Sequence, residues 1–508
     1  MENVSPGSCK RPIARCGKYG VPSGMMLMKE RNEGRLSSAS KVTETNPLQG
    51  MRVCLFRWEG NKIVEDILPA LRDSGCEVSV LEVRVQSIQT PGGSKTAFTV
   101  DGRGEYLTYF YRKIEAFDPD LILLCNSHGL DPHGLLYAIA ELKEVPLVNW
   151  FLDNPYFFPM MRHPRSFRFI SYAVFDSAYV EQMRKDGYKG VFSLPLAVNP
   201  YRFENINAVV DKPECGVLFV GRSGLNNIQS VFRDIETGTG KMPDWVRRKV
   251  NETVEEGASF LQAYPDKAPQ LFLKDYAAQN PQYADFYNHQ HIMPLISSII
   301  DFKASFYLRR DIINSIDYVD IAVAGDEPWR EHIRAGIRFL GRLPYQTIGT
   351  NYSNAVINLN ISRYQLRTTM NQRAFDVPTA GGFLITDYRP GVDELFELDK
   401  EIVCYHNPDD LQKKIHYYIE RPVERSAIVQ CARKRILQEH TYARRLIQLV
   451  GNLRKTGVVK GKVERGAITK HNLGDELRPY LLKLTDWFQK NGLAHESAIF
   501  GRKLEESS

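Results

Sequence analysis

The sequence predicts an α/β protein with two open, mainly parallel sheets, a helical insertion in the second and extra helices near the C-terminal end. Short apolar runs alternate with amphipathic helical segments over residues 51–450, a pattern typical of sheets covered by helices on both faces. A polar stretch at Asn199–Pro213 interrupts this alternation. The chain has 508 residues, and single cores stop growing near ~250–300 residues. We therefore expect at least two domains, with the boundary in that polar stretch.

The first domain is expected to open with a β-α-β unit. Met51–Phe56 is a short apolar run, Ile63–Ser74 has apolar residues at helical spacing, and Glu77–Val83 supplies a second strand. The same alternation continues and predicts a parallel sheet. Its further elements are helices at Tyr106–Ala116, Leu135–Leu142 and Ser177–Asp186, and strands at Leu121–Cys125, Leu147–Phe151, Tyr172–Phe175 and Val191–Leu194.

A second sheet is expected to start at Gly216–Val220. Residues 225–315 then have a mainly helical pattern with many aromatic residues, which predicts an insertion or an enlarged face of this domain. The strand pattern returns afterwards. We expect strands at Asp320–Ala324, Phe339–Gly341, Ala355–Leu359 and Glu401–Tyr405, and helices at Gly391–Phe396, Asp409–Ile419, Pro422–Glu439 and Tyr442–Leu453.

These patterns divide the chain into four parts. Residues 1–48 are rich in Gly, Ser, Pro, Lys and Arg, so we expect a disordered basic tail. Residues 49–205 form the first domain and 206–450 the second. Residues 451–508 form a C-terminal helical extension. Its amphipathic segment Leu477–Phe488 is expected to pack on the body of the protein or to form an oligomer contact.

Composition excludes several classes of protein. The net charge of +6 is spread over a long chain, and no Lys/Arg run carries interleaved aromatic residues, so nucleic-acid binding is not expected. No run of 18 apolar residues predicts a transmembrane segment. The N-terminus lacks the apolar core of a secretory signal, because Val21–Met28 is short and interrupted.

Cysteine usage favours a cytoplasmic protein. No C-x-x-C pair occurs, and several cysteines lie in apolar runs, which predicts reduced, buried thiols. The eight cysteines are Cys9, Cys16, Cys54, Cys76, Cys125, Cys215, Cys404 and Cys431.

Residues 354–387 are the most informative stretch for function. They predict a strand, a polar loop, a helix opening near Met370 and a second strand. Asn371, Arg373 and Asp376 are expected on this helix, where i, i+3 and i+4 neighbours share a face. A strand-loop-helix unit directs the helix start toward the carboxyl end of the strand, where phosphates bind in open sheets. A carboxylate one turn further can reach a ribose diol, so the stretch predicts half of a nucleotide site. The alternative is a surface ion pair on a helix.

Other residues around this stretch are weaker candidates for the nucleotide site. Gly381 and Gly382 would allow backbone amides to approach a phosphate, although Gly-Gly after a helix is also an ordinary C-cap. Asn358 and Asn360 end an apolar run and would point into a cleft or form a strand-end turn.

A second candidate loop follows the first strand of the second domain. Gly221, Arg222, Ser223 and Gly224 would lie beneath a diphosphate, with Arg222 as a second cation. A single G-x-x-G is weak evidence, since turns use glycine in the same way.

These blocks resemble the CgeB-like (spore-maturation-protein-like) glycosyltransferases, a GT-B group. The second half carries Ile357–Asn360, Asn371–Asp376, Ala380–Asp387, Glu394–Phe396 and Glu439–Tyr442, and the first half carries Trp150–Pro155, Val174–Asp176 and Leu194–Ala197. The resemblance covers roughly residues 51–450. One departure concerns position 376, where the family pattern more usually has Glu.

The resemblance implies two Rossmann-like domains facing across a cleft. In such proteins the last helices often cross back onto the first domain, and Tyr442–Leu453 is the candidate here. The leading hypothesis is a glycosyltransferase that moves a sugar from a nucleotide-sugar, with UDP expected before GDP, ADP or dTDP, to an acceptor hydroxyl. The resemblance further implies retention of anomeric configuration. Alternatives are a nucleotide-sugar epimerase of similar build and a non-catalytic nucleotide-binding scaffold, for which Asp376 in place of Glu gives some support.

Two loops of the first domain are candidates for the reaction centre. His128 follows the strand Leu121–Cys125 and would bond the transferred sugar or the acceptor, and Asp153 follows Leu147–Phe151 and would orient or deprotonate the attacking hydroxyl. Polar residues after strands are also frequent turn formers. Asp176 is weaker, because it can serve as the N-cap of the next helix.

No metal or other cofactor is expected. Asp118-Pro-Asp120 spells a D-x-D but precedes a strand and contains proline, so we interpret it as structural, and no His/Cys cluster has metal-ligand spacing. The acceptor is left open among a glycan, a lipid-linked sugar, a protein and a small molecule. An oligomer through the C-terminal helices is also left open.

Overall fold

The computed structural model describes residues 46–58, 62–90, 93–100, 106–131, 133–204, 206, 214–239, 242–459, 462–463, 471–490 and 497–502. Residues 45–508 form one compact unit that contains both sheets. The expected disordered tail lies outside the described residues except for 46–48, and so do Cys9 and Cys16.

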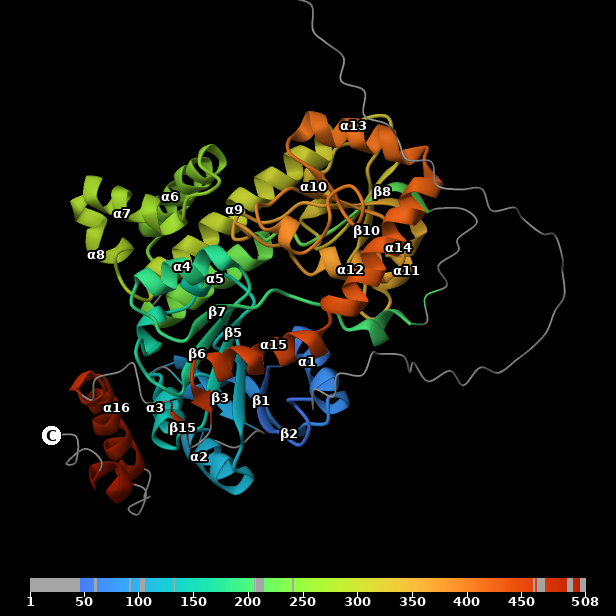
Figure 1. Ribbon diagram of the computed structural model, residues 1–508. Helices are drawn as coiled ribbons and strands as arrows, with labels where there is room; N and C mark the ends of the chain where they lie inside the picture. The colour runs from blue at the N-terminus through green and yellow to red at the C-terminus, as the bar shows by residue number, and fades with distance from the viewer. Residues whose placement is uncertain are drawn as a thin grey trace, which may run out of the picture. The chain divides into compact units, whose positions relative to one another are not determined.

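The first sheet has seven strands (Figure 1). All neighbouring strands are parallel except for one antiparallel pair at an edge. The central strands are buried along their whole length, as their continuous apolar runs require in a sheet covered on both faces. In sheet order the strands are β3 (Gly93–Val100), β2 (Glu77–Thr90), β1 (Arg52–Trp58), β4 (Leu121–Cys125), β5 (Leu147–Phe151), β6 (Ile170–Val174) and β7 (Val191–Ser193).

The β2–β3 hairpin was not predicted. The expected strand Glu77–Val83 continues to Thr90, and β3 pairs antiparallel with this extension. Its sequence, GSKTAFTV, has little of the apolar pattern that marks the other strands. The helices of this domain agree with expectation and are α1 (Lys62–Asp73), α2 (Tyr106–Phe117), α3 (Leu135–Leu142) and α4 (Ser177–Lys185).

The second sheet has six strands, all parallel. The strand directly after β8 in the chain, β9, pairs on one side of it and β11 on the other, so the strand order reverses at β8. In sheet order the strands are β10 (Arg338–Gly341), β9 (Ile321–Ala324), β8 (Cys215–Val220), β11 (Ala355–Asn360), β12 (Leu384–Asp387) and β13 (Val403–Tyr405). The switch point at β8 is the usual ligand position in such sheets.

The predicted helical insertion is present and has its own core. It consists of α5 (Leu225–Thr239), α6 (Asp244–Ala263), α7 (Pro269–Gln279), α8 (Ala284–Tyr287) and α9 (Ile292–Ser315). The 24-residue α9 belongs to two cores: Ile296 and Ile300 pack within the insertion, whereas Ile312 and Ile313 pack on the second sheet. It therefore fixes the insertion to the sheet.

The remaining helices of the second domain surround its sheet. They are α10 (Trp329–His332), α11 (Ile348–Asn354), α12 (Arg373–Thr379), α13 (Pro408–Ile419) and α14 (Pro422–Glu439). The helix predicted at Gly391–Phe396 is reduced to a 3₁₀ turn at Val392–Glu394. The short helices α10 and α11 were not predicted.

The chain returns to the first domain after α14. The Val198 N–H donates to the His440 carbonyl (3.0 Å), and the Tyr442 N–H donates to the Val198 carbonyl (3.1 Å). The next helix, α15 (Tyr442–Lys455), packs on α1, and Figure 1 shows the two side by side. Two parallel open sheets with a returning helix form the GT-B arrangement, so the predicted fold class is confirmed.

The C-terminal extension packs on the body of the protein. Strands β14 (Val458–Val459) and β15 (Lys462–Val463) form a two-stranded sheet, and α16 (His471–Lys490) contacts α3. Leu481, Leu484 and Phe488 of α16 are buried, and the ring of Phe488 lies 5.6 Å from that of Tyr111 in α2. The first of the two expectations for this segment, packing on the body, is confirmed.

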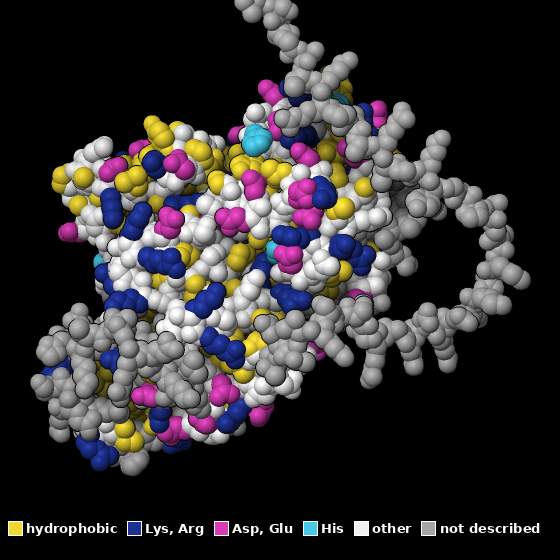
Figure 2. Space-filling view, viewed as in Figure 1, with side chains coloured by type: hydrophobic (Ala, Val, Ile, Leu, Met, Phe, Trp, Pro, Cys, Tyr) yellow, Lys and Arg dark blue, Asp and Glu magenta, His cyan; other side chains and the backbone are white. Residues whose placement is uncertain are grey.

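Charge and surface features agree with the composition. Figure 2 shows basic and acidic side chains mixed over the face in view. Within the described ranges, no helix is both long and apolar enough to span a bilayer. The six described cysteines are free thiols.

Candidate functional site

A pocket of about 430 Å³ lies at the carboxyl edge of the second sheet, next to the switch point. Gly221 and Arg222 line it directly after β8, and Gly325 and Asp326 directly after β9. From the first domain, Lys62 of α1 also lines it. The pocket thus lies between the two domains, where an open α/β sheet binds its ligands.

Arg373 and Asp376 both face this pocket from α12. Asp376 is only 2% exposed, and Arg373 is half-buried. Among the described residues, Arg373 forms no ion pair with a carboxylate. Its Nε donates to Asn360 Oδ1 (2.9 Å) instead. The alternative of a surface ion pair is therefore wrong. Because α12 has only seven residues, the arginine side chain is the stronger candidate for a phosphate contact than the helix start.

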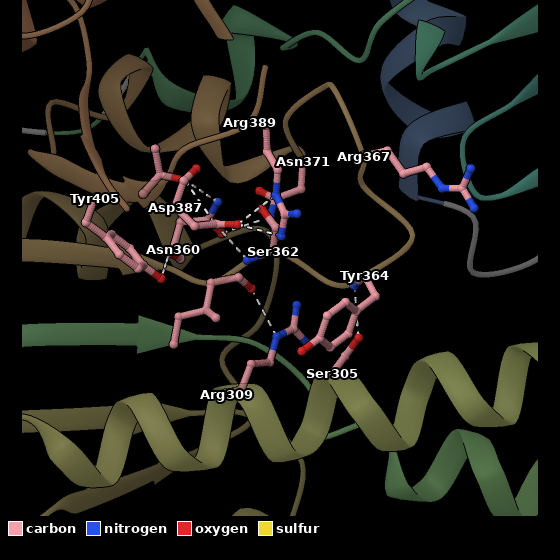
Figure 3. Close-up of polar contacts among 12 residues, drawn as sticks. Ser305, Arg309, Asn360, Ser362, Tyr364, Arg367, Asn371, Asp387, Arg389 and Tyr405 are labelled. Atoms are coloured by element: carbon pink, nitrogen blue, oxygen red, sulfur yellow. Dashed lines mark hydrogen bonds and ion pairs between the residues drawn. The ribbon is translucent and has the colours of Figure 1, made fainter. Parts of the chain in front are cut away.

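Asn360 holds Arg373 and Asn371 in place. The Asn360 Oδ1 atom accepts from Asn371 Nδ2 (2.8 Å) as well as from Arg373, and Asn360 Nδ2 donates to Thr386 Oγ1 (2.9 Å). Tyr405 donates to the Asn360 carbonyl (3.3 Å), as Figure 3 shows. Every polar group of the Asn360 side chain is thus bonded, which explains a buried asparagine at the end of β11.

Asp376 carries a raised pKa. Burial raises the pKa of this carboxyl to about 7, and the carboxylate of Asp66 adds to the rise, while the bond from Gln372 opposes it. Gln372 Nε2 donates to Asp376 Oδ1 (2.8 Å), and the Tyr345 hydroxyl lies 3.4 Å from Oδ2. A carboxyl poised near neutral pH at the wall of a pocket is typical of a functional site.

The loop after β8 is fixed to the neighbouring strand. Asp326 accepts from the Ser223 N–H (2.5 Å) and from Ser223 Oγ (2.7 Å). The Gly221 carbonyl accepts from Trp329 Nε1 (2.8 Å). Arg222 is exposed and lines the pocket. The structure therefore brings Gly221 and Arg222 to the same pocket as Arg373 and Asp376.

A second, larger pocket of about 790 Å³ adjoins the first. Arg222, Asn227 and Arg373 line both pockets. The predicted reaction-centre residues, His128 and Asp153, line only the larger one. Helices α5 and α9 of the insertion supply much of its wall, including Val231, Leu295, Ser298 and Phe302.

His128 and Asp153 have different surroundings in the larger pocket. The Nδ1 atom of His128 is buried without a hydrogen-bond partner, and burial lowers the pKa of its imidazole. Asp153 accepts from Asn126 Nδ2 (2.8 Å) through Oδ2 and from Gln365 Nε2 (2.8 Å) through Oδ1. His128 is thus a neutral ring with an unused nitrogen, and Asp153 a carboxylate held from two sides.

Gly381 and Gly382 are not part of this site, which corrects the prediction. Both precede β12, so they lie at the amino edge of the sheet, opposite the pocket. Gly381 has φ +88°, as expected for the residue after a helix, and lines a separate depression with Arg433. A Cβ on Gly382 would lie 2.6 Å from the Tyr352 carbonyl, so this glycine serves packing.

Asn358 is also structural. It lines neither pocket, and its Nδ2 donates to the carbonyls of Tyr352 (2.9 Å) and Phe383 (3.2 Å).

Several residues at the site were not singled out by the sequence patterns. Tyr345 lies between two cations, with Lys62 4.4 Å and Arg202 4.0 Å from its ring centre. Its hydroxyl lies 3.3 Å from Asp66 Oδ2 as well as near Asp376. Gln365, which lines the larger pocket, was not singled out by the sequence patterns either. These contacts join residues far apart in the chain, so no local motif marks them.

Asp176, which the sequence marked as a possible N-cap, also binds a loop of the second domain. It caps α4 by accepting from the Ala178 N–H (3.0 Å). It also accepts from the N–H groups of Arg367 (2.7 Å) and Thr368 (2.9 Å) and from Thr368 Oγ1 (2.6 Å). One buried carboxylate of the first domain thus holds the β11–α12 loop of the second.

Across the described parts of the chain, no group of three or more His, Cys, Asp or Glu side chains is arranged to hold a metal ion. Positive charge at the junction of the two pockets is supplied by arginines.

A family model described as glycosyl transferase-like matches residues 308–451. The match extends from the end of α9 into α15 and includes Asn360, Arg373 and Asp376. This part of the chain is therefore similar to a glycosyl transferase-like domain. No curated protein matches the chain.

Three solved structures illustrate the proteins to which this chain is similar in fold. A glycosyltransferase from Rickettsia africae ESF-5 has 9% identity, covers 80% of this chain and 98% of its own, and has a TM-score of 0.42. The Anabaena HepE protein in complex with UDP has 10% identity, 80% and 100% coverage and a TM-score of 0.44. Sucrose-phosphate synthase from Thermosynechococcus elongatus has 12% identity, 80% and 98% coverage and a TM-score of 0.41. At these values the fold assignment rests on the chain's own sheets.

Proposed function

We propose that this chain is a glycosyltransferase that binds a nucleotide-sugar in the smaller pocket and transfers the sugar to an acceptor hydroxyl in the larger one. The observation that carries the proposal is the position of Arg222 and Arg373. Both lie where the two pockets meet. A diphosphate joins the nucleoside to the sugar, so it belongs at this junction.

The two arginines suit a leaving diphosphate. As the glycosidic bond to the donor breaks, negative charge builds on the phosphate oxygens, and fixed cations stabilise that charge. The guanidinium of Arg373 is oriented by Asn360 and is free of any carboxylate partner among the described residues. Its donors are therefore available, and a planar guanidinium matches two phosphate oxygens. We propose no metal, because these cations can take that role.

Asp376 is the proposed ribose ligand. Its carboxylate lies in the wall of the smaller pocket, one turn after Arg373, and can accept from both ribose hydroxyls when charged. An aspartate is one methylene shorter than the glutamate of the CgeB-like pattern. We expect the ribose to lie correspondingly closer to α12. UDP is the first nucleotide to test, as the resemblance implies, and the same resemblance implies retention of configuration.

His128 and Asp153 are the proposed groups of the reaction side. Asp153 would orient the acceptor hydroxyl and accept its proton, and the unused Nδ1 of His128 would bond a sugar hydroxyl. The walls from α5 and α9 combine apolar and hydroxyl side chains. We propose that the insertion contacts the acceptor, whose class is left to a screen.

The first test is thermal-shift titration of the purified protein with UDP, GDP, ADP and dTDP. Arg373→Ala and Asp376→Ala are the site variants. Arg367→Ala is the matched control, since Arg367 lies on the loop before α12, lines neither pocket and has its guanidinium carbon 5.0 Å from the centre of the Tyr179 ring. Figure 3 shows the Arg367 side chain pointing away from Asn360 and Asn371.

Three outcomes are informative. Selective stabilisation by one nucleotide, lost in both site variants and kept in the control, supports the donor site and directs an acceptor screen with the matching sugars. Binding without transfer or donor hydrolysis favours the non-catalytic scaffold. No stabilisation by any nucleotide rejects the donor site.

A further inference from the structure

The loop between β11 and α12 carries one side chain that reaches the proposed reaction centre in the other domain. Gln365 is 6% exposed. Its Nε2 donates to Asp153 Oδ1 (2.8 Å), and its Oε1 accepts from the Asn154 N–H (3.1 Å). One amide of the second domain thus contacts two consecutive residues that follow β5 of the first.

The other side of Asp153 is held from within its own domain. Asn126 Nδ2 donates to Asp153 Oδ2 (2.8 Å), and Asn126 Oδ1 accepts from the N–H groups of Leu152 (2.7 Å) and Asp153 (3.2 Å). Asn126 has φ +52°, a backbone conformation that asparagine tolerates better than most residues. The carboxylate therefore lies between two amide donors, one from each domain, and only the donor from the first domain is independent of how the domains meet.

The loop is fixed to the first domain without help from the Gln365 side chain. The Tyr179 hydroxyl donates to the Gln365 carbonyl (2.7 Å), and Asp176 accepts from the Arg367 and Thr368 N–H groups. Loss of the Gln365 amide would leave these bonds in place. The amide is thus not needed to dock the loop, which points to a different role.

We propose that Gln365 is a positioning residue that orients Asp153 for proton transfer only when the two domains are docked. The inference rests on the proposed function, because it takes Asp153 as the group that receives the acceptor proton. Since the loop also carries Asn371 and Arg373 at its other end, the same segment that holds the donor diphosphate completes the base. An undocked enzyme would keep its nucleotide ligands but hold Asp153 by one donor alone. Donor hydrolysis by water would be suppressed in that state.

The test compares Gln365→Met with Tyr179→Phe. Methionine keeps the length of the side chain and removes the amide, whereas Tyr179→Phe removes another cross-domain bond of the same loop without touching Asp153. We expect Gln365→Met to lower kcat by roughly 10-fold or more, the usual effect of a lost hydrogen bond to a charged group. The nucleotide Kd should stay within about twofold, because Asn371 and Arg373 are unaffected. We expect kcat of Tyr179→Phe to stay near that of the wild type.

A charged replacement gives a readout that a merely structural role would not. In Gln365→Glu the new carboxylate repels Asp153 at high pH, but its protonated form can again donate a hydrogen bond. Activity relative to wild type should therefore recover as the pH falls.

The outcomes separate the two proposals. If the wild type transfers sugar, kcat of Gln365→Met is unchanged and Gln365→Glu does not recover activity as the pH falls, the positioning role is rejected and the glycosyltransferase proposal stands. If the wild type neither transfers nor hydrolyses any nucleotide-sugar, the proposed function fails and this inference fails with it.

Discussion

Replacing Asp376 by asparagine should make the protein more stable and its nucleotide binding weaker. The carboxyl is 2% exposed, and burial raises its pKa to about 7 from 3.8. A carboxyl with a raised pKa stabilises the fold only while it is protonated. That stability is fully present below the unfolded pKa of 3.8 and is lost as the pH rises through the folded value. Asparagine has a similar shape and does not titrate, so Asp376→Asn escapes this loss.

The size of the effect follows from the pKa shift. A rise of about 3 pKa units at 1.36 kcal/mol per unit corresponds to at most about 4 kcal/mol. Between pH 4 and pH 7 the stability difference between variant and wild type should grow by about 1.4 kcal/mol per pH unit and then level off. In a domain of this size, each kcal/mol shifts the unfolding temperature by about 2–4 °C.

The assay is thermal unfolding of wild type and Asp376→Asn at pH 5.5, 6.5, 7.5 and 8.5. Asp393→Asn is the control, because Asp393 is exposed and outside both pockets. We expect the advantage of Asp376→Asn to widen from pH 5.5 to pH 7.5 and to stay constant above, with no such trend in the control. A parallel UDP titration should show wild-type affinity rising through about pH 7 and little affinity in the variant.

A variant that is no more stable than wild type at pH 8.5 would refute the reasoning. The carboxylate would then be compensated in the fold, and its burial would carry no cost. If stability rises as expected but nucleotide affinity is unchanged, the electrostatic argument stands and the ribose contact is wrong.

Three further predictions concern the same region. Arg373→Lys should weaken nucleotide binding by roughly 10- to 150-fold, because a lysine cannot reproduce the paired, charge-assisted hydrogen bonds of the guanidinium. Calorimetric titration measures the Kd, and an unchanged Kd would place the diphosphate elsewhere. Asp176→Ala should destabilise the protein by about 2 kcal/mol or more, because it leaves two part-buried N–H donors without an acceptor. A loss below about 1 kcal/mol in denaturant unfolding would mean that water replaces the carboxylate. In Gly325→Ala, nucleotides should no longer raise the unfolding temperature, since the added Cβ would lie 2.3 Å from the Gly221 carbonyl and force the loop after β8 to move. Intact binding in the thermal-shift titration would show that this loop is not needed.

Buried apolar runs made most of both sheets predictable. Strands such as β4 and β5 are short, mainly apolar segments between turn signals, and they lie where the sequence pattern predicted them. The β2–β3 hairpin was missed because β3 is largely polar. The short α10 and α11 were missed because four to seven residues give too little helical periodicity.

The candidate site likewise contains residues that the sequence could predict and residues that it could not. Arg373 and Asp376 were predictable because one helix carries both. Gly381 and Gly382 were misplaced because a Gly-Gly pair has the same appearance in a phosphate loop and in a C-cap. Their position before a strand already argued for the far edge of the sheet. Gln365 was not predictable, since its contact with Asp153 spans 212 positions in the chain and depends on how two domains meet.

The chain leaves the first domain and re-enters it at neighbouring positions, and this has a consequence for how such proteins can diversify. Val198 pairs with Thr441, so the segment that leaves the first domain and the segment that re-enters it are neighbours. The segment between them, residues 199–440, contains the helical insertion and every described lining residue of the smaller pocket except Lys62, and its two ends are adjacent. A recombination event that replaced residues 199–440 as a block would rejoin the first domain without lengthening a single connection. Donor specificity could thus be exchanged between relatives in one genetic step, while α15 and the first sheet stay unchanged.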